Sequence, residues 1–111
     1  MNGNKLLLDT NILLYLLDGD ETLSTLLEEK SIYISFITEL ELYSFKLLSK
    51  EAKSAISNVL DQCTIIDINV RIKEHAILIR TSEGLKLPDS IIAATAIYLD
   101  IPLISADQGF K

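Results

Sequence analysis

The sequence contains four short apolar runs that are separated by longer segments with helical periodicity. The first of them, LLL at residues 6–8, is apolar at every position and does not alternate with polar residues. A strand of this kind is buried on both faces, which is typical of a parallel sheet covered by helices. The expected strands are residues 5–8, 31–35, 63–67 and 101–105. Because strands and helices alternate, the pattern predicts an α/β fold with right-handed crossovers.

The expected helices connect these strands. They cover residues 11–17, 21–29, 36–48, 51–60, 69–82 and 88–99. In the helix of residues 69–82, the spacing of Val70, Ile77 and Leu78 predicts that these three side chains point inward. Gly84 is expected to end that helix, since glycine tolerates the left-handed conformation that often follows a helix.

Length and composition limit the function of the chain. Its 111 residues are expected to form one domain, residues 1–111. A net charge of −6 argues against broad electrostatic attachment to nucleic acid or to an anionic membrane. No apolar run is long enough to cross a membrane and no secretion signal is recognisable, so we expect a cytoplasmic protein. One cysteine and one histidine exclude a zinc cluster, and any metal ion needs oxygen ligands.

Acidic residues gather where a ligand would bind. In open α/β sheets, ligands bind beyond the carboxyl ends of the strands. Asp9 ends the first expected strand, and Asp107 follows the fourth by two residues. Asp89 lies in the first turn of the helix that leads into the fourth strand. The topology therefore brings three acids to one edge of the sheet.

The helix that follows Ser35 offers a fourth acid, either Glu39 or Glu41. Two positions apart, these side chains point roughly 200° away from each other, so only one can face inward. Glu39 is expected to share a solvated face with lysines at 46, 50 and 53. Glu41 lies on an apolar stripe with Ile37 and Phe45. The helical pattern therefore selects Glu41.

Taken singly, each acid has a structural explanation, such as a helix cap for Asp9 or a turn for Asp107. Together they favour a cation site. Two carboxylates about 5 Å apart repel by roughly 3 kcal/mol at an effective dielectric constant near 20. No lysine or arginine is adjacent to any of the four acids. Mg²⁺ or Mn²⁺ would relieve the repulsion and would attract phosphate groups to an acidic protein.

Four segments carry a family resemblance. LLLDTNILLYLL, ISFITELEL, LPDSIIAATA and LISADQGF resemble, in order, the four acidic motifs of the PIN domain, as found in VapC-type toxins of type II toxin–antitoxin systems. The resemblance implies a three-layer α/β/α fold with a central parallel sheet. Four strands are evident, and the fifth edge strand that is usual in this family is not expected before Lys111.

The resemblance also implies the site. It assigns four acids to catalysis and metal binding, namely Asp9, Glu41, Asp89 and Asp107. It assigns supporting roles to Thr10, Asn11 and Ser105, the last two by hydrogen bonds to the carboxylates. The implied cofactor is Mg²⁺ or Mn²⁺.

The implied activity is that of an endoribonuclease that hydrolyses single-stranded RNA. The implied partners are a second copy of the chain and a cognate antitoxin that inserts a peptide into the groove. One alternative is a PIN-like domain that binds RNA or a protein without cutting. A phosphatase of the haloacid dehalogenase type fits less well, because it needs a second aspartate where Asn11 stands.

Overall fold

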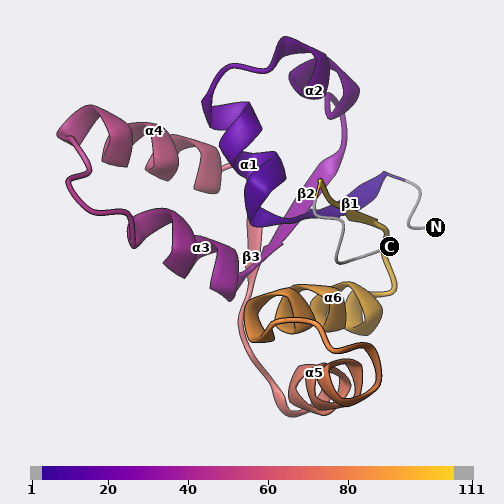
Figure 1. The fold of residues 1–111 in the computed structure, drawn as a ribbon. Helices are drawn as coiled ribbons and strands as arrows, with labels where there is room; N and C mark the ends of the chain where they lie inside the picture. The colour runs from indigo at the N-terminus through magenta and orange to yellow at the C-terminus, as the bar shows by residue number, and fades with distance from the viewer. Residues whose placement is uncertain (1–3, 107–111) are drawn as a thin grey trace.

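The computed structural model describes residues 4–106 of the chain. Ten elements follow one another in this part, as Figure 1 shows: β1 (Lys5–Leu8), α1 (Thr10–Leu17), α2 (Glu21–Leu26), β2 (Ser31–Ser35), α3 (Phe36–Tyr43), α4 (Lys50–Leu60), β3 (Thr64–Ile66), α5 (Val70–Glu83), α6 (Leu87–Leu99) and β4 (Leu103–Ile104). Strands and helices therefore alternate as the sequence predicts, although β3 and β4 are shorter than expected.

The four described strands form one parallel sheet in the order β3-β2-β1-β4. The first strand of the chain is thus a central strand. Its residue Leu7 is in register with Tyr33 of β2 on one side and with Leu103 of β4 on the other. The residue that follows β1, Asp9, consequently emerges at the carboxyl edge between two neighbouring strands.

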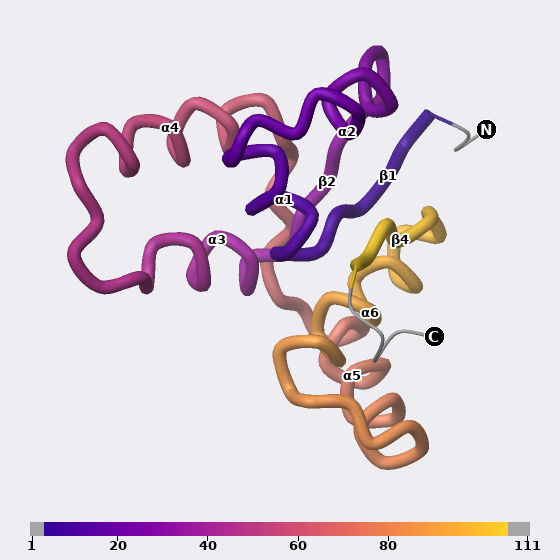
Figure 2. The backbone as a smooth tube through the Cα atoms, turned by 45° about the horizontal axis from the view of Figure 1, so that its top comes forward, coloured from indigo at the N-terminus to yellow at the C-terminus, as the bar shows by residue number. Residues whose placement is uncertain are grey.

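The apolar run of β1 is buried on both faces of the sheet. Successive side chains of a strand point to opposite faces, and Leu7 and Leu8 are both fully buried. Leu8 packs in a cluster with Ile12 of α1, whereas Leu7 packs with Ile92 of α6. Figures 1 and 2 show α1 and α4 on one side of the sheet and α5 and α6 on the other. The predicted three-layer α/β/α fold with a central parallel sheet is confirmed.

The helix predicted for residues 36–48 is wrong at its end, because α3 stops at Tyr43. The Ser44 hydroxyl donates a hydrogen bond to the Leu40 carbonyl at 2.5 Å, and Leu47 adopts a positive φ of 61°. A new helix then starts with Ser49, whose hydroxyl oxygen accepts a hydrogen bond from the backbone of α4. The predicted lysine face of Glu39 therefore does not exist, and Glu39 itself is half-buried.

The inward face predicted for α5 is also wrong. Val70, Ile77 and Leu78 are 67%, 63% and 63% exposed, whereas Ile72 and Ala76 are buried. The buried pair packs in one cluster with Ile91 and Ala94 of α6. Gly84 ends α5 in the left-handed conformation, with φ 71°, as predicted. In the described part of the chain, no helix is long and apolar enough to span a bilayer.

Candidate active site

Asp9 is held through both of its carboxylate oxygens. It is only 3% exposed and is the N-cap of α1, where its Oδ1 accepts a hydrogen bond from the Ile12 amide at 2.9 Å. Its Oδ2 accepts a hydrogen bond from the Ser105 hydroxyl at 2.5 Å. Since each carboxylate oxygen has two lone pairs, both can still bind a cation. The Asp9 carboxylate is therefore held in one direction by the end of β1, by the hydrogen bond of the helix cap and by the hydrogen bond from Ser105.

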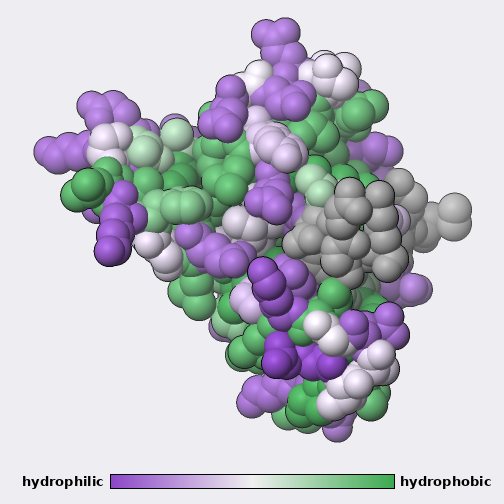
Figure 3. Space-filling view, in the orientation of Figure 1, coloured by the Kyte–Doolittle hydropathy of each residue, from purple (hydrophilic) through white to green (hydrophobic). Residues whose placement is uncertain are grey.

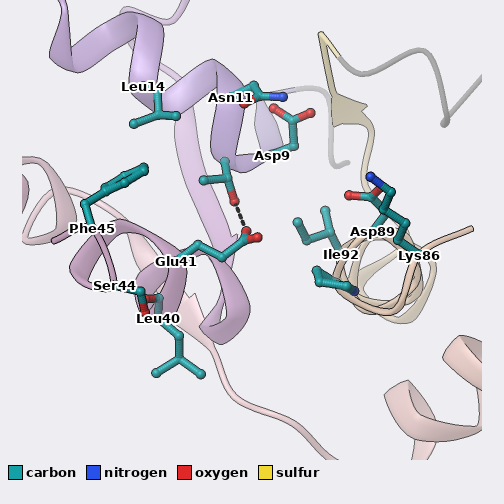
Figure 4. A pocket seen from close by; sticks show the side chains of 12 residues that line it. Asp9, Asn11, Leu14, Leu40, Glu41, Ser44, Phe45, Lys86, Asp89 and Ile92 are labelled. Carbon is teal, nitrogen blue, oxygen red and sulfur yellow. Dashed lines mark hydrogen bonds between the residues drawn. The ribbon is translucent and has the colours of Figure 1, made fainter.

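Glu41 is held by a residue from another helix. The Thr10 hydroxyl at the start of α1 donates a hydrogen bond to Glu41 Oε1 at 2.5 Å, drawn as a dashed line in Figure 4. Thr10 Oγ1 also lies 3.1 Å from the hydroxyl oxygen of Thr38, a fully buried residue of α3. Thr10 therefore links the two helices through their polar side chains and restrains the glutamate.

Asp9, Glu41 and Asp89 line one pocket of about 580 Å³. Figure 4 shows α1 and α3 on one side of this pocket and the start of α6 on the other. Asp89 is half-buried in the first turn of α6, where the helix dipole favours a negative charge. The remaining lining residues are Thr10, Asn11, Leu14, Leu40, Ser44, Phe45, Lys86, Pro88 and Ile92. We call this space the acidic pocket.

The acidic pocket has one apolar wall. Phe45 is 50% exposed and lines the pocket just beyond α3, and Leu40 of α3, which is 55% exposed, lines it as well. On the face shown in Figure 3, hydrophobic and hydrophilic surface are interspersed over α3 and α4, and hydrophilic surface lies where α3 approaches α6. The pocket thus offers both charged and apolar contacts to a ligand.

The structure brings together most of the residues that the sequence singled out. Thr10 and Asn11 line the acidic pocket with the three acids, and Ser105 contacts Asp9. Glu39 is not among the residues that line it, in agreement with the choice of Glu41. Asp107 lies outside the described residues.

Three residues at or behind the pocket were missed by the sequence analysis. Lys86 is the one cation among the described lining residues, and it is the N-cap residue of α6, three positions before Asp89. Phe45 lines the pocket four positions after Glu41, although its helix has ended. Thr38 lies three positions before Glu41, but nothing in a buried threonine indicates which hydroxyl it faces.

The donor set of the acidic pocket fits a hard cation. All three acids offer carboxylate oxygens, which Mg²⁺ and Mn²⁺ prefer. Among residues 4–106, no three acid, histidine or cysteine side chains form a group that could hold an ion together. Mg²⁺ commonly keeps several water ligands and binds one or two carboxylates directly. The described residues therefore fit a partly hydrated ion.

The fold and the pocket together define a class of α/β protein that has acids at the carboxyl edge of a parallel sheet, where ligands bind in such folds. The sequence narrows the class, because residues 6–111 match the model of the PIN domain family. The chain belongs to the PIN domain family. No curated protein matches the sequence.

Solved structures agree with this assignment. A toxin–antitoxin complex from Klebsiella pneumoniae contains a chain that is 33% identical, with 95% of this chain and 89% of that chain covered and a TM-score of 0.82. VapBC-1 from nontypeable Haemophilus influenzae is 27% identical, with 93% and 87% covered and a TM-score of 0.72. VapBC2 from Rickettsia felis, bound to a promoter DNA fragment, is 24% identical, with 96% and 90% covered and a TM-score of 0.80; it supports the fold alone. The predicted resemblance to VapC-type PIN domains is confirmed.

Proposed function

We propose that this chain is a metal-dependent endoribonuclease of the VapC toxin type, which hydrolyses phosphodiester bonds in single-stranded RNA. The observation that carries the proposal is the acidic pocket, where Asp9, Glu41 and Asp89 come together from three separate segments of a PIN domain. Membership of this family supports a nuclease. The metal ion and the RNA substrate rest on the chemistry of the pocket.

A cation is the natural partner of these acids. Three carboxylates in a chain of net charge −6 repel one another and also repel the phosphates of a substrate. We assign Asp9 and Asp89 as the direct ligands of Mg²⁺ or Mn²⁺, and Glu41 and Asp107 as acids that would hold a second ion or bind the first one through water. A bound ion of this kind supplies polarisation of the phosphodiester and activation of water.

The residues of the chain prepare the pocket for that chemistry. Ser105 and the Ile12 amide hold the Asp9 carboxylate in one orientation, so that it does not have to be ordered when a ligand arrives. Thr10 does the same for Glu41. Side chains that are already fixed lose little entropy on binding, which favours a precise site.

Two lining residues suit an RNA strand. The exposed ammonium group of Lys86 can contact a phosphate group, and the half-exposed ring of Phe45 can stack on an unpaired base. A base that stacks in this way must be free of a complementary strand. This geometry therefore favours a single-stranded nucleic acid, and we propose that the substrate is RNA.

We also propose a cognate antitoxin and a second copy of the chain as partners. The similar structures from Klebsiella pneumoniae and Haemophilus influenzae are toxin–antitoxin or VapBC complexes. The apolar wall of the acidic pocket offers contacts for an inserted antitoxin peptide, and the acids offer contacts for a basic side chain of that peptide. Bound there, the peptide would exclude the substrate.

The test is cleavage of an end-labelled, single-stranded RNA with Mg²⁺ or Mn²⁺ by the antitoxin-free protein. Asp89→Asn and Glu41→Gln should each lower the rate by at least about 100-fold, since each removes a ligand charge. Glu39→Gln is the matched control, because Glu39 lies on the same helix as Glu41 but does not line the pocket.

Two results would overturn the proposal. One is equal cleavage by the wild type and by both pocket variants, which would point to a contaminating nuclease. The other is no cleavage by a well-folded wild type under any of these conditions. RNA binding without cleavage would then support the alternative of a non-catalytic RNA-binding module.

A further inference from the structure

A pair of threonine hydroxyls lies behind the Glu41 carboxylate. Thr10 Oγ1 is 2.5 Å from Glu41 Oε1 and 3.1 Å from Thr38 Oγ1. Thr38 is fully buried, so its hydroxyl cannot be solvated. The three side chains form one hydrogen-bonded chain from the interior of α3 to the acidic pocket.

Each hydroxyl group has one proton, and this determines which group donates in each of the two hydrogen bonds. An ionised carboxylate can only accept a hydrogen bond, and a hydroxyl group has one proton to donate. The Thr10 proton is used on Glu41, so the Thr10 oxygen can only accept from its other neighbour. Thr38 therefore donates to Thr10, and Thr10 donates to Glu41.

Thr38 differs from Thr81 and Thr95, which lie further along their helices. A threonine within a helix commonly donates to the carbonyl four residues earlier. Thr95 of α6 does so to Ile91 at 2.7 Å, and Thr81 of α5 does so to Ile77 at 3.1 Å. Thr38 lies in the first turn of α3, where the residue four positions earlier is Ile34 of β2, and among the described residues its hydroxyl is hydrogen-bonded to Thr10. Its proton is thus available to the chain that leads to the pocket.

We propose that Thr38 is a positioning residue for the acidic pocket. Because Thr38 donates to the Thr10 oxygen, the Thr10 hydroxyl can donate only to Glu41 Oε1. Glu41 is then fixed by one oxygen, and its second oxygen is available to a cation. The proposal rests on the proposed function, since it assigns a role in preparing a metal ligand.

The test replaces the Thr38 hydroxyl by a methyl group of similar size. Thr38→Val should weaken Mn²⁺ binding to the RNA-free protein about tenfold, and should lower kcat for RNA cleavage about tenfold with little change in KM. Mn²⁺ binding is measured by electron paramagnetic resonance of the free ion. Thr38→Ser keeps the hydroxyl and should therefore retain most of the Mn²⁺ affinity and most of the kcat of the wild type.

Thr95→Val is the matched control, because Thr95 is 1% exposed, lies in a helix and does not line the acidic pocket. It should lower the melting temperature as Thr38→Val does, but should leave Mn²⁺ affinity and kcat within about twofold of the wild type. Equal effects of the two valine variants on Mn²⁺ binding would show that Thr38 has only a packing role.

A second comparison tests whether Thr38 acts through Thr10. The double variant with Thr10→Val and Thr38→Val should bind Mn²⁺ no more weakly than Thr10→Val alone, whereas independent roles would give additive losses. Additive losses would overturn the proposal, even where Thr38→Val is poorly stable by itself. Wild-type protein that neither binds Mn²⁺ nor cleaves RNA would instead refute the proposed function, and this inference with it.

Discussion

Asp9 has two separable roles, as a helix cap and as a charge in the acidic pocket. Asp9→Asn keeps an acceptor for the Ile12 amide at 2.9 Å, so the free energy of unfolding should stay within about 1 kcal/mol of the wild type. Asp9→Ala loses the cap and leaves a buried N–H without its acceptor, which should cost about 2 kcal/mol. In both variants the pocket loses one negative charge.

The stability gained on Mn²⁺ binding distinguishes the cap role of Asp9 from its role as a metal ligand. At a Mn²⁺ concentration about 100 times its dissociation constant, the wild type should gain about 2.7 kcal/mol of stability. Asp9→Asn should gain almost nothing, because its amide is a poor ligand for a hard cation. The measurement is urea unfolding, followed by circular dichroism, with and without Mn²⁺.

Asp20 provides the matched control. It caps α2 through a hydrogen bond from the Leu23 amide, also 2.9 Å long, but it is exposed and does not line the acidic pocket. Asp20→Asn should therefore gain as much stability from Mn²⁺ as the wild type. An equal gain by Asp9→Asn would refute the reasoning, since it would show that Asp9 is a cap and not a ligand.

Three further predictions concern single side chains. Ser105→Ala removes the hydrogen bond to Asp9 Oδ2 and should lower the rate of RNA cleavage about tenfold; a wild-type rate would contradict this role. Lys86→Ala should raise KM and reduce the salt dependence of RNA binding by about one phosphate contact, whereas Lys73→Ala, on the exposed side of α5, should change neither. Burial raises the pKa of the Cys63 thiol, so less thiolate is present at pH values near the usual pKa; labelling by a disulfide reagent should be slower than for free cysteine and should become fast in urea.

The sequence predicts the strands of the sheet centre well, because their apolar runs have no competing interpretation. Both β1 and β2 occupy the predicted residues. The break after Tyr43 could not be predicted, since the helical periodicity continues through it and the break depends on local hydrogen bonds of Ser44 and Ser49. Periodicity also failed for α5, whose apolar residues lie on more than one face. The buried face is determined by packing against α6, where Ile72 and Ala76 form one cluster with Ile91 and Ala94.

The acids of the candidate site could be predicted because topology determines which strand ends and helix starts meet. The hydroxyls that hold them are harder to predict. Thr10 and Glu41 are 31 residues apart, and only the crossing of α1 and α3 shows that they form a pair. The role of Thr38 depends on the direction of a single proton, which no sequence pattern records.

The hydrogen bond between Ser105 and Asp9 also has a consequence for the order of events during synthesis. Its two residues are 96 positions apart. At typical translation rates, a ribosome needs about 5–20 s to add that many residues. During this interval the nascent chain holds Asp9 without Ser105 and without β4, the strand that flanks β1 on one side. The Asp9 carboxylate therefore gains the hydrogen bond from Ser105 only at the end of this interval.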